Sequence, residues 1–526
     1  MRDFNSPGRS PVYATNGMVA TSHPLAASTA LNILRQGGSA ADAAIAGAVI
    51  LGLCEPHMCG IGGDMFALVK PAGSEDIIAL NASGKAPAGF DAAALRNQGI
   101  TKIDRDTAAA VTVPGAVDGF ATLSERFGKL GLDACLAPAI DAAKNGVPVA
   151  PRVATDWADC AANLSPTAAK TYLLSGVSPA TGQVFRHEGT ARALEAIAAH
   201  GRDGFYKGPV AEDMVAALSS AGGAHTLDDF AATKSDWGTP IAGTYKGTDL
   251  VEHPPNGQGA TAILLANILS SFDLAAFAPN SADRIHIEME ATKLAYDARN
   301  RILADPDHTA RLAHMTSPET ARKLAAKIQM SSAMADAKPL TEEVHRDTVL
   351  ITAVDADGMA VTLIYSIFAS FGSGIAGPDF GILMHNRGAG FTLEAGHPNE
   401  AAPGKRPMHT IIPAMLRQND RVTMAFGVMG GQYQATGHAH VLTNLIDYGM
   451  DPQEALDSPR AFTEAGELRL ERGFSDDVAS DLEARGHTIV RPELPIGGGQ
   501  AIAIDHQNGT LIGASDPRKD GCAIGY

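Results

Sequence analysis

The residues around Thr348 suggest that it takes part in chemistry. The charged run His345-Arg346-Asp347 precedes it, and a strand-like apolar stretch follows it. If the chain were cut between Asp347 and Thr348, this threonine would carry both a hydroxyl and a free α-amine. An α-amine with a pKa of about 8 can act as the base for the hydroxyl, so that one residue supplies nucleophile and base. The alternative is an ordinary strand threonine, because threonine is common in strands.

A second candidate element is the glycine pair Gly430-Gly431, which follows the apolar run 422–429. Backbone N–H groups of successive glycines can approach a developing negative charge without obstruction by side chains. The pair therefore predicts an oxyanion site, and a tight turn without that role is the alternative.

Arg387, His409 and Thr410 are candidate ligands for a substrate carboxylate. The planar guanidinium of Arg387 suits a bidentate carboxylate, and His409 and Thr410 could share it. Two other interpretations remain open. Arg387 could instead form a structural salt bridge with Asp379 or Glu394, and His409 could be a packed core histidine.

A predicted hairpin positions Thr348. Alternating apolar runs at 349–354 and 359–367 flank Asp355-Ala356-Asp357-Gly358. An Asp-x-Asp-Gly between two such runs is a strong hairpin signal. Thr348 then stands at the outer end of the first strand.

The best predicted helix spans 282–301 and contains His286, Glu288 and Glu290. A His-x-Glu-x-Glu run could suggest a metal site, but this spacing turns successive side chains to different faces of a helix. We therefore expect a solvated or salt-bridged surface here. A second helix is predicted over 316–338. No metal or organic cofactor is expected.

The glycine cluster Gly60-Ile61-Gly62-Gly63 could be mistaken for a phosphate cradle. It leads into the strand-like run 65–70 rather than into a helix, so dinucleotide binding is not favoured.

Composition limits the classes of partner. With 526 residues, 45% of them hydrophobic and 19% charged, the chain can build a large core. A formal charge of −17 argues against binding to nucleic acid or to anionic membranes. The five cysteines form no CxxC pair, and the N-terminus lacks an apolar signal segment. We expect a cytoplasmic protein.

The motifs, in their order, resemble the γ-glutamyltransferase family of N-terminal-nucleophile hydrolases. They are, in sequence, 37–44, 55–66, 112–120, the hairpin from Thr348 through 371–374, and the terminal 513–518 with 525–526. The resemblance implies an α+β fold, a four-layer αββα sandwich, with an appended helical lobe at about 121–229. It also implies self-cleavage before Thr348 into a large subunit, 1–347, and a small subunit, 348–526. A dimer of such heterodimers is one assembly that the sequence allows.

The same resemblance suggests roles and departures. Ser366 stands where the family has a threonine that hydrogen-bonds the nucleophile, although it could be a plain strand serine. Gly430-Gly431 match the family's oxyanion glycines. The family's anchors for the α-amino and α-carboxylate groups of glutamate are missing, since their positions fall near Ser83 and at Phe368, Gly390 and His409-Thr410. Because they stand at anchor positions, Ser83 and Phe368 are also predicted to bind the substrate. A buried ammonium needs acceptors, so the substrate need not carry one.

These observations predict hydrolysis of a small amide whose acyl part bears a carboxylate, oxamate-like or glutaryl-like. The segment 392–404 has only 13 residues, which leaves little room for a lid and favours hydrolysis over transfer. One alternative is a γ-glutamyl hydrolase or transferase acting on glutathione. Another is an uncleaved, inactive relative that acts as a binding protein.

Overall fold

Two seven-stranded antiparallel sheets form the centre of the molecule. The computed structural model describes residues 8–335 and 348–526. The first sheet runs, in spatial order, β1 (Val12–Ala14), β18 (Thr510–Ser515), β17 (Gly498–Asp505), β13 (Arg421–Met429), β12 (Ala414–Gln418), β9 (Thr248–Glu252) and β8 (Ile241–Tyr245). The second runs β19 (Cys522–Gly525), β2 (Met18–Thr21), β10 (Val349–Val354), β11 (Ala360–Ser366), β3 (Asp64–Lys70), β4 (Ile78–Ala82) and β7 (Asp236–Gly238).

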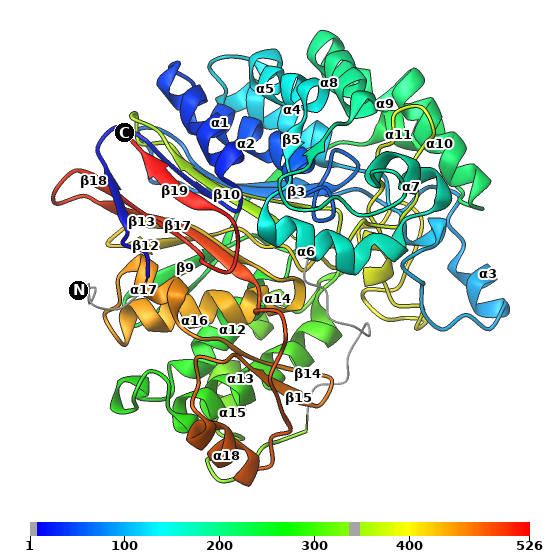
Figure 1. Cartoon of the computed structure of the whole chain (residues 1–526). Coiled ribbons are helices and arrows are strands. Elements are labelled where there is room, and N and C mark those ends of the chain that lie inside the picture. Colours follow the sequence, from blue (N-terminus) through cyan, green and yellow to red (C-terminus); the bar gives the residue numbers. More distant parts are fainter. Residues whose placement is uncertain (1–7, 336–347) are drawn as a thin grey trace.

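Helices cover the outer face of each sheet, so the layers are helix, sheet, sheet, helix (Figure 1). The layer over the second sheet contains α1 (Pro24–Arg35), α2 (Ala40–Cys54), α4 (Ala116–Phe127), α5 (Leu132–Asn145) and α8 (Glu188–His200). The layer over the first sheet contains α12 (Gly259–Leu269), α16 (Gln434–Ile446) and α17 (Pro452–Asp457). The αββα prediction is confirmed.

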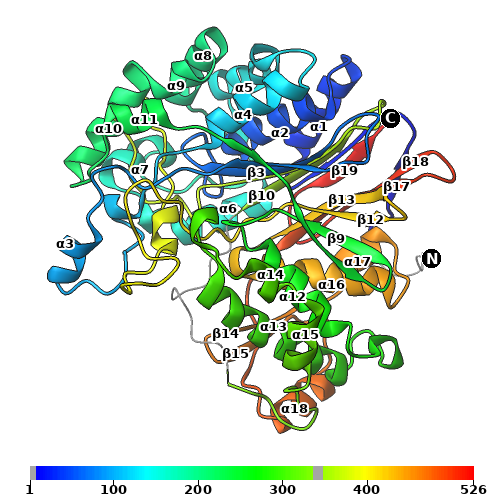
Figure 2. The ribbon, with the colours of Figure 1, turned by 180° about the vertical axis from the view of Figure 1, so that it is seen from behind.

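The remaining elements extend these two layers. The predicted helical lobe is made up of α6 (Pro151–Cys160), α7 (Pro166–Tyr172), α9 (Asp203–Tyr206), α10 (Pro209–Ser220), α11 (Leu227–Ala232), β5 (Val147–Pro148) and β6 (Val184–Phe185), together with helices of the upper layer. The helix α3 (Ala92–Asn97) lies apart from α8, at the right-hand edge of Figure 1. Below α12 lie α13 (Ala282–Ile302), α15 (Pro318–Ala325), α18 (Asp476–Ala484), β14 (Ala461–Glu464) and β15 (Glu467–Leu470), seen from behind in Figure 2. The short helix α14 (Leu312–Met315) contacts α12, and β16 (Ile489–Val490) pairs with β15.

Small residues let α2 lie close to the strand that follows Thr348. Every residue of α2 except Gly52 is buried, and Ser39 and Asp42 form a capping box at its start. A Cβ added at Gly47 would lie 2.2 Å from Cδ1 of Ile351 in β10. The glycine therefore sets the distance between this helix and the second sheet.

Two sequence predictions need correction. The helix expected over 316–338 is shorter, because α15 ends at Ala325 and 326–335 form turns and an isolated bridge. The segment 336–347 lies outside the described residues. The triad His286, Glu288 and Glu290 is not at the surface: all three side chains are buried. The reason is that α13 packs against α12 on one side and against α18 and β14 on another.

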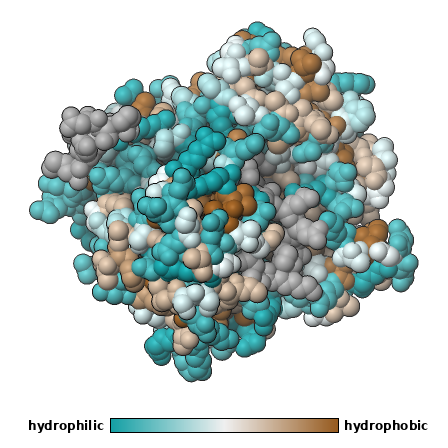
Figure 3. Space-filling model, turned by 60° about the horizontal axis from the view of Figure 1, so that its bottom comes forward, coloured by the Kyte–Doolittle hydropathy of each residue, from teal (hydrophilic) through white to brown (hydrophobic). Residues whose placement is uncertain are grey.

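On the face shown in Figure 3, hydrophobic side chains form small patches between hydrophilic ones. Among the described residues, no helix is both long enough and apolar enough to cross a lipid bilayer.

Candidate active site

Three neighbouring strands bring polar side chains to one end of the second sheet. The register of β10, β11 and β3 places Thr348, Ser366 and Asp64 side by side, and all three are fully buried. An apolar cluster between the sheets contains Leu350, Ile364 and Phe66. These residues lie two positions along their strands from Thr348, Ser366 and Asp64, in that order. Because strand side chains alternate between faces, the three polar groups point into the space between the two sheets.

The first sheet supplies the predicted oxyanion glycines. Met429, the last residue of β13, belongs to the same apolar cluster, and the chain then turns through Gly430 and Gly431 into η6 (Gly431–Tyr433) and α16. Their φ angles of 123° and 56° lie in the region that favours glycine. A Cβ at Gly430 would also lie 2.8 Å from Cα of Gly497. The tight turn is thus present at the start of a helix, where anions are favoured. The oxyanion role stays a prediction.

Gln434, the first residue of α16, contacts the predicted nucleophile. Its Nε2 donates to Oγ1 of Thr348 over 3.3 Å, and its Oε1 accepts from the backbone N–H of Ile412 over 2.9 Å. Sequence reasoning assigned this residue no role. The available signal was its position at the start of a helix, just after a glycine pair.

Ser366 holds the turn that follows β11. Its Oγ accepts a hydrogen bond from the backbone N–H of Phe368 over 2.8 Å. Phe368 has a φ of 76°, which a bulky residue rarely adopts. Such strain persists where the surroundings enforce it, commonly at functional sites. The role of Ser366 in self-cleavage remains a prediction.

Arg387, in η5 (Arg387–Gly390), is a fully buried cation. Its guanidinium lies 4.4 Å from the ring centroid of Phe368, and its Nη1 donates to Oγ1 of Thr410 over 3.3 Å. Within the described residues, its Nε and Nη2 have no hydrogen-bond partner. Burial lowers the pKa of Arg387 to about 9, against the opposing effect of Asp64, so the group is charged at neutral pH.

The alternative role of Arg387 as a structural salt bridge is wrong. In the described part of the chain, Asp379 and Glu394 form no ion pair with it. The guanidinium of Arg387 instead contacts the ring of Phe368 and the hydroxyl of Thr410.

Asp64 is the acidic group whose charge acts on Arg387. Its Oδ1 accepts from the backbone N–H groups of Gly84 and Gly115, each over 3.0 Å. Its Oδ2 lies 3.5 Å from Nε2 of His409 and 3.6 Å from Nδ1 of His385. Sequence reasoning gave Asp64 and His385 no function.

His409 is fully buried, and its ring lies 5.1 Å from that of Phe66. Burial, with the charge of Arg387 as a second cause, lowers the pKa of His409 well below its usual value, so the imidazole is neutral. It therefore packs in the core, as one interpretation held, and it also faces the carboxylate of Asp64.

Ser83 lies beside the segment that contains His409. Its hydroxyl donates to Oδ1 of Asn81 over 2.6 Å and accepts from Asn256, which also bonds to the carbonyl of Pro407. These contacts place Ser83 next to the candidate site, and among the described residues it forms no hydrogen bond with Arg387. Its substrate-binding role stays a prediction.

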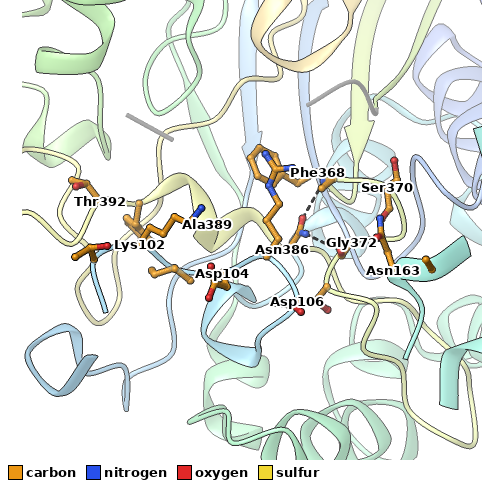
Figure 4. A pocket seen from close by; sticks show the side chains of 17 residues that line it. Lys102, Asp104, Asp106, Asn163, Phe368, Ser370, Gly372, Asn386, Ala389 and Thr392 are labelled. Atoms are coloured by element: carbon orange, nitrogen blue, oxygen red, sulfur yellow. Dashed lines mark hydrogen bonds between the residues drawn. The ribbon is translucent and has the colours of Figure 1, made fainter. Parts of the chain in front are cut away.

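A pocket of about 580 Å³ opens beside Phe368 (Figure 4). Lys102, Asp104, Asp106 and Asn163 are among the residues that line it. Asn386 fixes its floor, since Oδ1 accepts from the N–H of Ala369 and Nδ2 donates to the carbonyl of Gly372. Phe368 thus lines this pocket and also contacts the guanidinium of Arg387.

Comparison with known proteins decides the family. The gamma-glutamyltranspeptidase family profile matches residues 26–526. The chain belongs to this family. The oxamate amidohydrolase proenzyme of Klebsiella pneumoniae is 35% identical over 98% of this chain and 99% of its own length. The glutathione hydrolase-like YwrD proenzyme of Bacillus subtilis is 34% identical over the same shares of the two chains.

A solved structure of cephalosporin acylase from Bacillus halodurans is also similar to this γ-glutamyltranspeptidase-family chain. It superposes with a TM-score of 0.92 at 37% identity, covering 100% of this chain and 99% of the other. The resemblance inferred from the motifs, and with it an autoprocessed hydrolytic enzyme, is confirmed. The relatives are made as proenzymes, which fits one precursor cut into two subunits. Asp347, on the predicted cleavage bond, lies outside the described residues.

Proposed function

We propose that this protein is a self-cleaving N-terminal-threonine amidohydrolase that acts on a small amide with a carboxylate in its acyl part, oxamate-like or glutaryl-like. One observation carries the proposal: Arg387 is buried and charged, and two of its N–H donor groups lack an acceptor within the described residues. A buried charge is costly unless it is paired. A substrate carboxylate would supply the missing acceptor.

Gln258 connects this anchor to the predicted oxyanion turn. Its Nε2 donates to the carbonyl oxygens of Thr410 and Gly431, over 2.7 and 3.1 Å. Thr410 in turn accepts from Arg387. A substrate held by its carboxylate at Arg387 would therefore present its amide carbonyl towards the glycine turn and Thr348. Fixed geometry of this kind lowers the entropic part of the barrier.

The proposed reaction has two halves. Oγ1 of Thr348 attacks the amide carbon while its own α-amine takes the hydroxyl proton, and the N–H groups at Gly430 and Gly431 stabilise the oxyanion. The amine then gives the proton to the leaving nitrogen, the C–N bond breaks, and an ester to Thr348 remains. Water, deprotonated by the same amine, attacks that ester and releases the free acid and the hydroxyl.

The main alternative is hydrolysis of a γ-glutamyl amide. The glutathione hydrolase proenzyme of Escherichia coli, 32% identical over 98% of this chain, favours it. The positions that would hold an α-ammonium carry Phe368, Gly390 and His409 here, which argues against it.

A panel of oxamate, a glutaryl amide and a γ-glutamyl anilide tests the proposal, with release of ammonia or amine as the readout. Turnover of one of the first two, well above that of the anilide, is expected. Turnover of the anilide alone would overturn the assigned substrate class.

A further inference from the structure

A histidine and glutamate cluster lies in the lower helical layer, apart from the candidate active site. His286 and Glu290 are one turn apart on the same face of α13, and His487 lies between α18 and β16. All three are buried, and one ligand atom from each lies within 4.8 Å of the others. We propose that His286, Glu290 and His487 form a binding site for a divalent transition metal ion of the zinc type.

Hydrogen bonding fixes the orientation of the His286 ring and leaves its Nδ1 available as a ligand. Its Nε2 lies 2.9 Å from the carbonyl oxygen of Gln329, so this nitrogen carries the proton and donates. Its Nδ1 is then unprotonated and faces Nε2 of His487 at 2.9 Å. A ring N–H donated to a backbone carbonyl is the usual way in which a metal-binding histidine is oriented.

The geometry requires only a small adjustment. Two nitrogens bound tetrahedrally to Zn²⁺ at about 2.0–2.1 Å lie about 3.3 Å apart. The two ring nitrogens are 2.9 Å apart, so they must separate by a few tenths of an ångström. The metal would replace the proton shared between the rings, and His487 would take the tautomer with its proton on Nδ1.

Glu290 provides the third ligand at the expense of one ion-pair contact. Its Oε1 accepts from Nζ of Lys293 over 2.9 Å, and its Oε2 accepts from the backbone N–H of Met334 over 2.8 Å. Lys293 also donates to the carbonyl of Met334, so it keeps a partner when Oε1 turns to a metal. Two imidazoles and one carboxylate suit zinc, cobalt or nickel and leave a fourth position for water.

The site would connect the two products of the proposed self-cleavage, and this consequence rests on the proposed function. His286 and Glu290 precede the bond between residues 347 and 348, whereas His487 follows it. A metal ion held by all three would therefore bridge the large and small subunits. Its role would be in assembly, because none of these residues contacts Thr348.

Titration of chelator-treated, dialysed protein with Zn²⁺ and with Co²⁺ tests the site. We expect one equivalent to bind, Co²⁺ to give the intense visible bands of a four-coordinate ion, Zn²⁺ to abolish those bands, and the Tm to rise when metal is added. His487→Ala and Glu290→Gln should weaken binding by more than the roughly 10- to 100-fold typical of a lost outer partner. His200→Ala, an exposed histidine at the end of α8, is the matched control and should leave binding unchanged.

Two results would overturn the site: absence of saturable binding to the wild-type protein, or undiminished binding to a His286→Ala/His487→Ala double variant whose metal-free Tm shows that it is folded. The wild-type titration decides the question even if the variants do not fold. The uncut Thr348→Ala variant should bind metal as tightly as the wild type. A failure of self-cleavage can therefore be told apart from a failure of the metal site.

Discussion

Nε2 of Gln434 donates to Oγ1 of Thr348 over 3.3 Å, from the first residue of a helix that follows the glycine turn. This contact connects α16 to the predicted nucleophile, which precedes a strand of the second sheet. The same side chain accepts from the backbone of Ile412, so its orientation is fixed from both ends.

Gln434 is therefore expected to position the nucleophile. Gln434→Leu removes a hydrogen bond worth about 1 kcal/mol and should lower kcat by roughly fivefold, with little change in KM. Steady-state kinetics on the processed enzyme measures this split. Gln418→Leu, a glutamine at the far end of β12, is the control. A rise in KM with kcat unchanged would place Gln434 in substrate binding instead.

Arg387 should determine the preference for a carboxylate. Arg387→Met keeps much of the contact with Phe368 but removes the charge. Loss of a charge-assisted hydrogen bond of about 1.5–3 kcal/mol should lower kcat/KM by about 10- to 150-fold for the carboxylated amide.

Arg105 offers a matched control for that change. Its guanidinium lies 5.9 Å from the same phenylalanine ring but belongs to the neighbouring pocket. Arg105→Met should affect kcat/KM far less. Equal losses from the two variants would contradict the assignment of Arg387 as the anchor.

Protonation of the buried His187 should make the protein less stable in acid. Burial lowers its pKa to about 4, and its Nδ1 caps α8 by accepting from the N–H of Thr190. Its stabilising contribution is therefore complete above the unfolded pKa of about 6.5 and is lost as the pH falls towards 4, because the unfolded chain binds the proton more readily. The Tm should drop across this interval.

His187→Asn preserves a capping side chain that does not titrate. Its Tm should fall less steeply than that of the wild type between pH 6.5 and 4, as followed by thermal unfolding. His200→Asn, exposed on the same helix, should leave the slope unchanged. Parallel curves for His187→Asn and the wild type would contradict the interpretation.

Sequence reasoning predicted the features that depend on local patterns. The Asp-x-Asp-Gly motif predicted the hairpin of β10 and β11, and the glycine pair predicted the turn before α16. Arg387 was singled out because a guanidinium suits a carboxylate. The burial of Arg387 and the lack of partners for its Nε and Nη2 depend on the packing of distant segments, which no local pattern predicts.

Long-range contacts account for what was missed. Asp64 reaches the site through strand pairing with Ser366, about 300 residues further along the chain, and no local pattern indicates this register. The triad on α13 was predicted at the surface because helical spacing reports the faces of one helix but not what covers them. His487, which joins His286, comes from a loop 201 residues away.

Thr348 variants test whether one residue is both nucleophile and site of cleavage. Thr348→Ala should stay a single chain and be inactive, whereas Thr348→Ser keeps a hydroxyl and should still cut itself and turn over substrate, more slowly. Denaturing electrophoresis after long incubation and the amide assay measure both properties. Two bands from Thr348→Ala would rule out the self-cleavage proposed here.

The most direct measurement is the intact mass, with the N-terminal sequence, of a preparation shown to be active. We expect two fragments, 1–347 and 348–526, of which the smaller begins with Thr348 and bears a free amine. Full activity in material in which residues 347 and 348 are still joined would contradict this expectation.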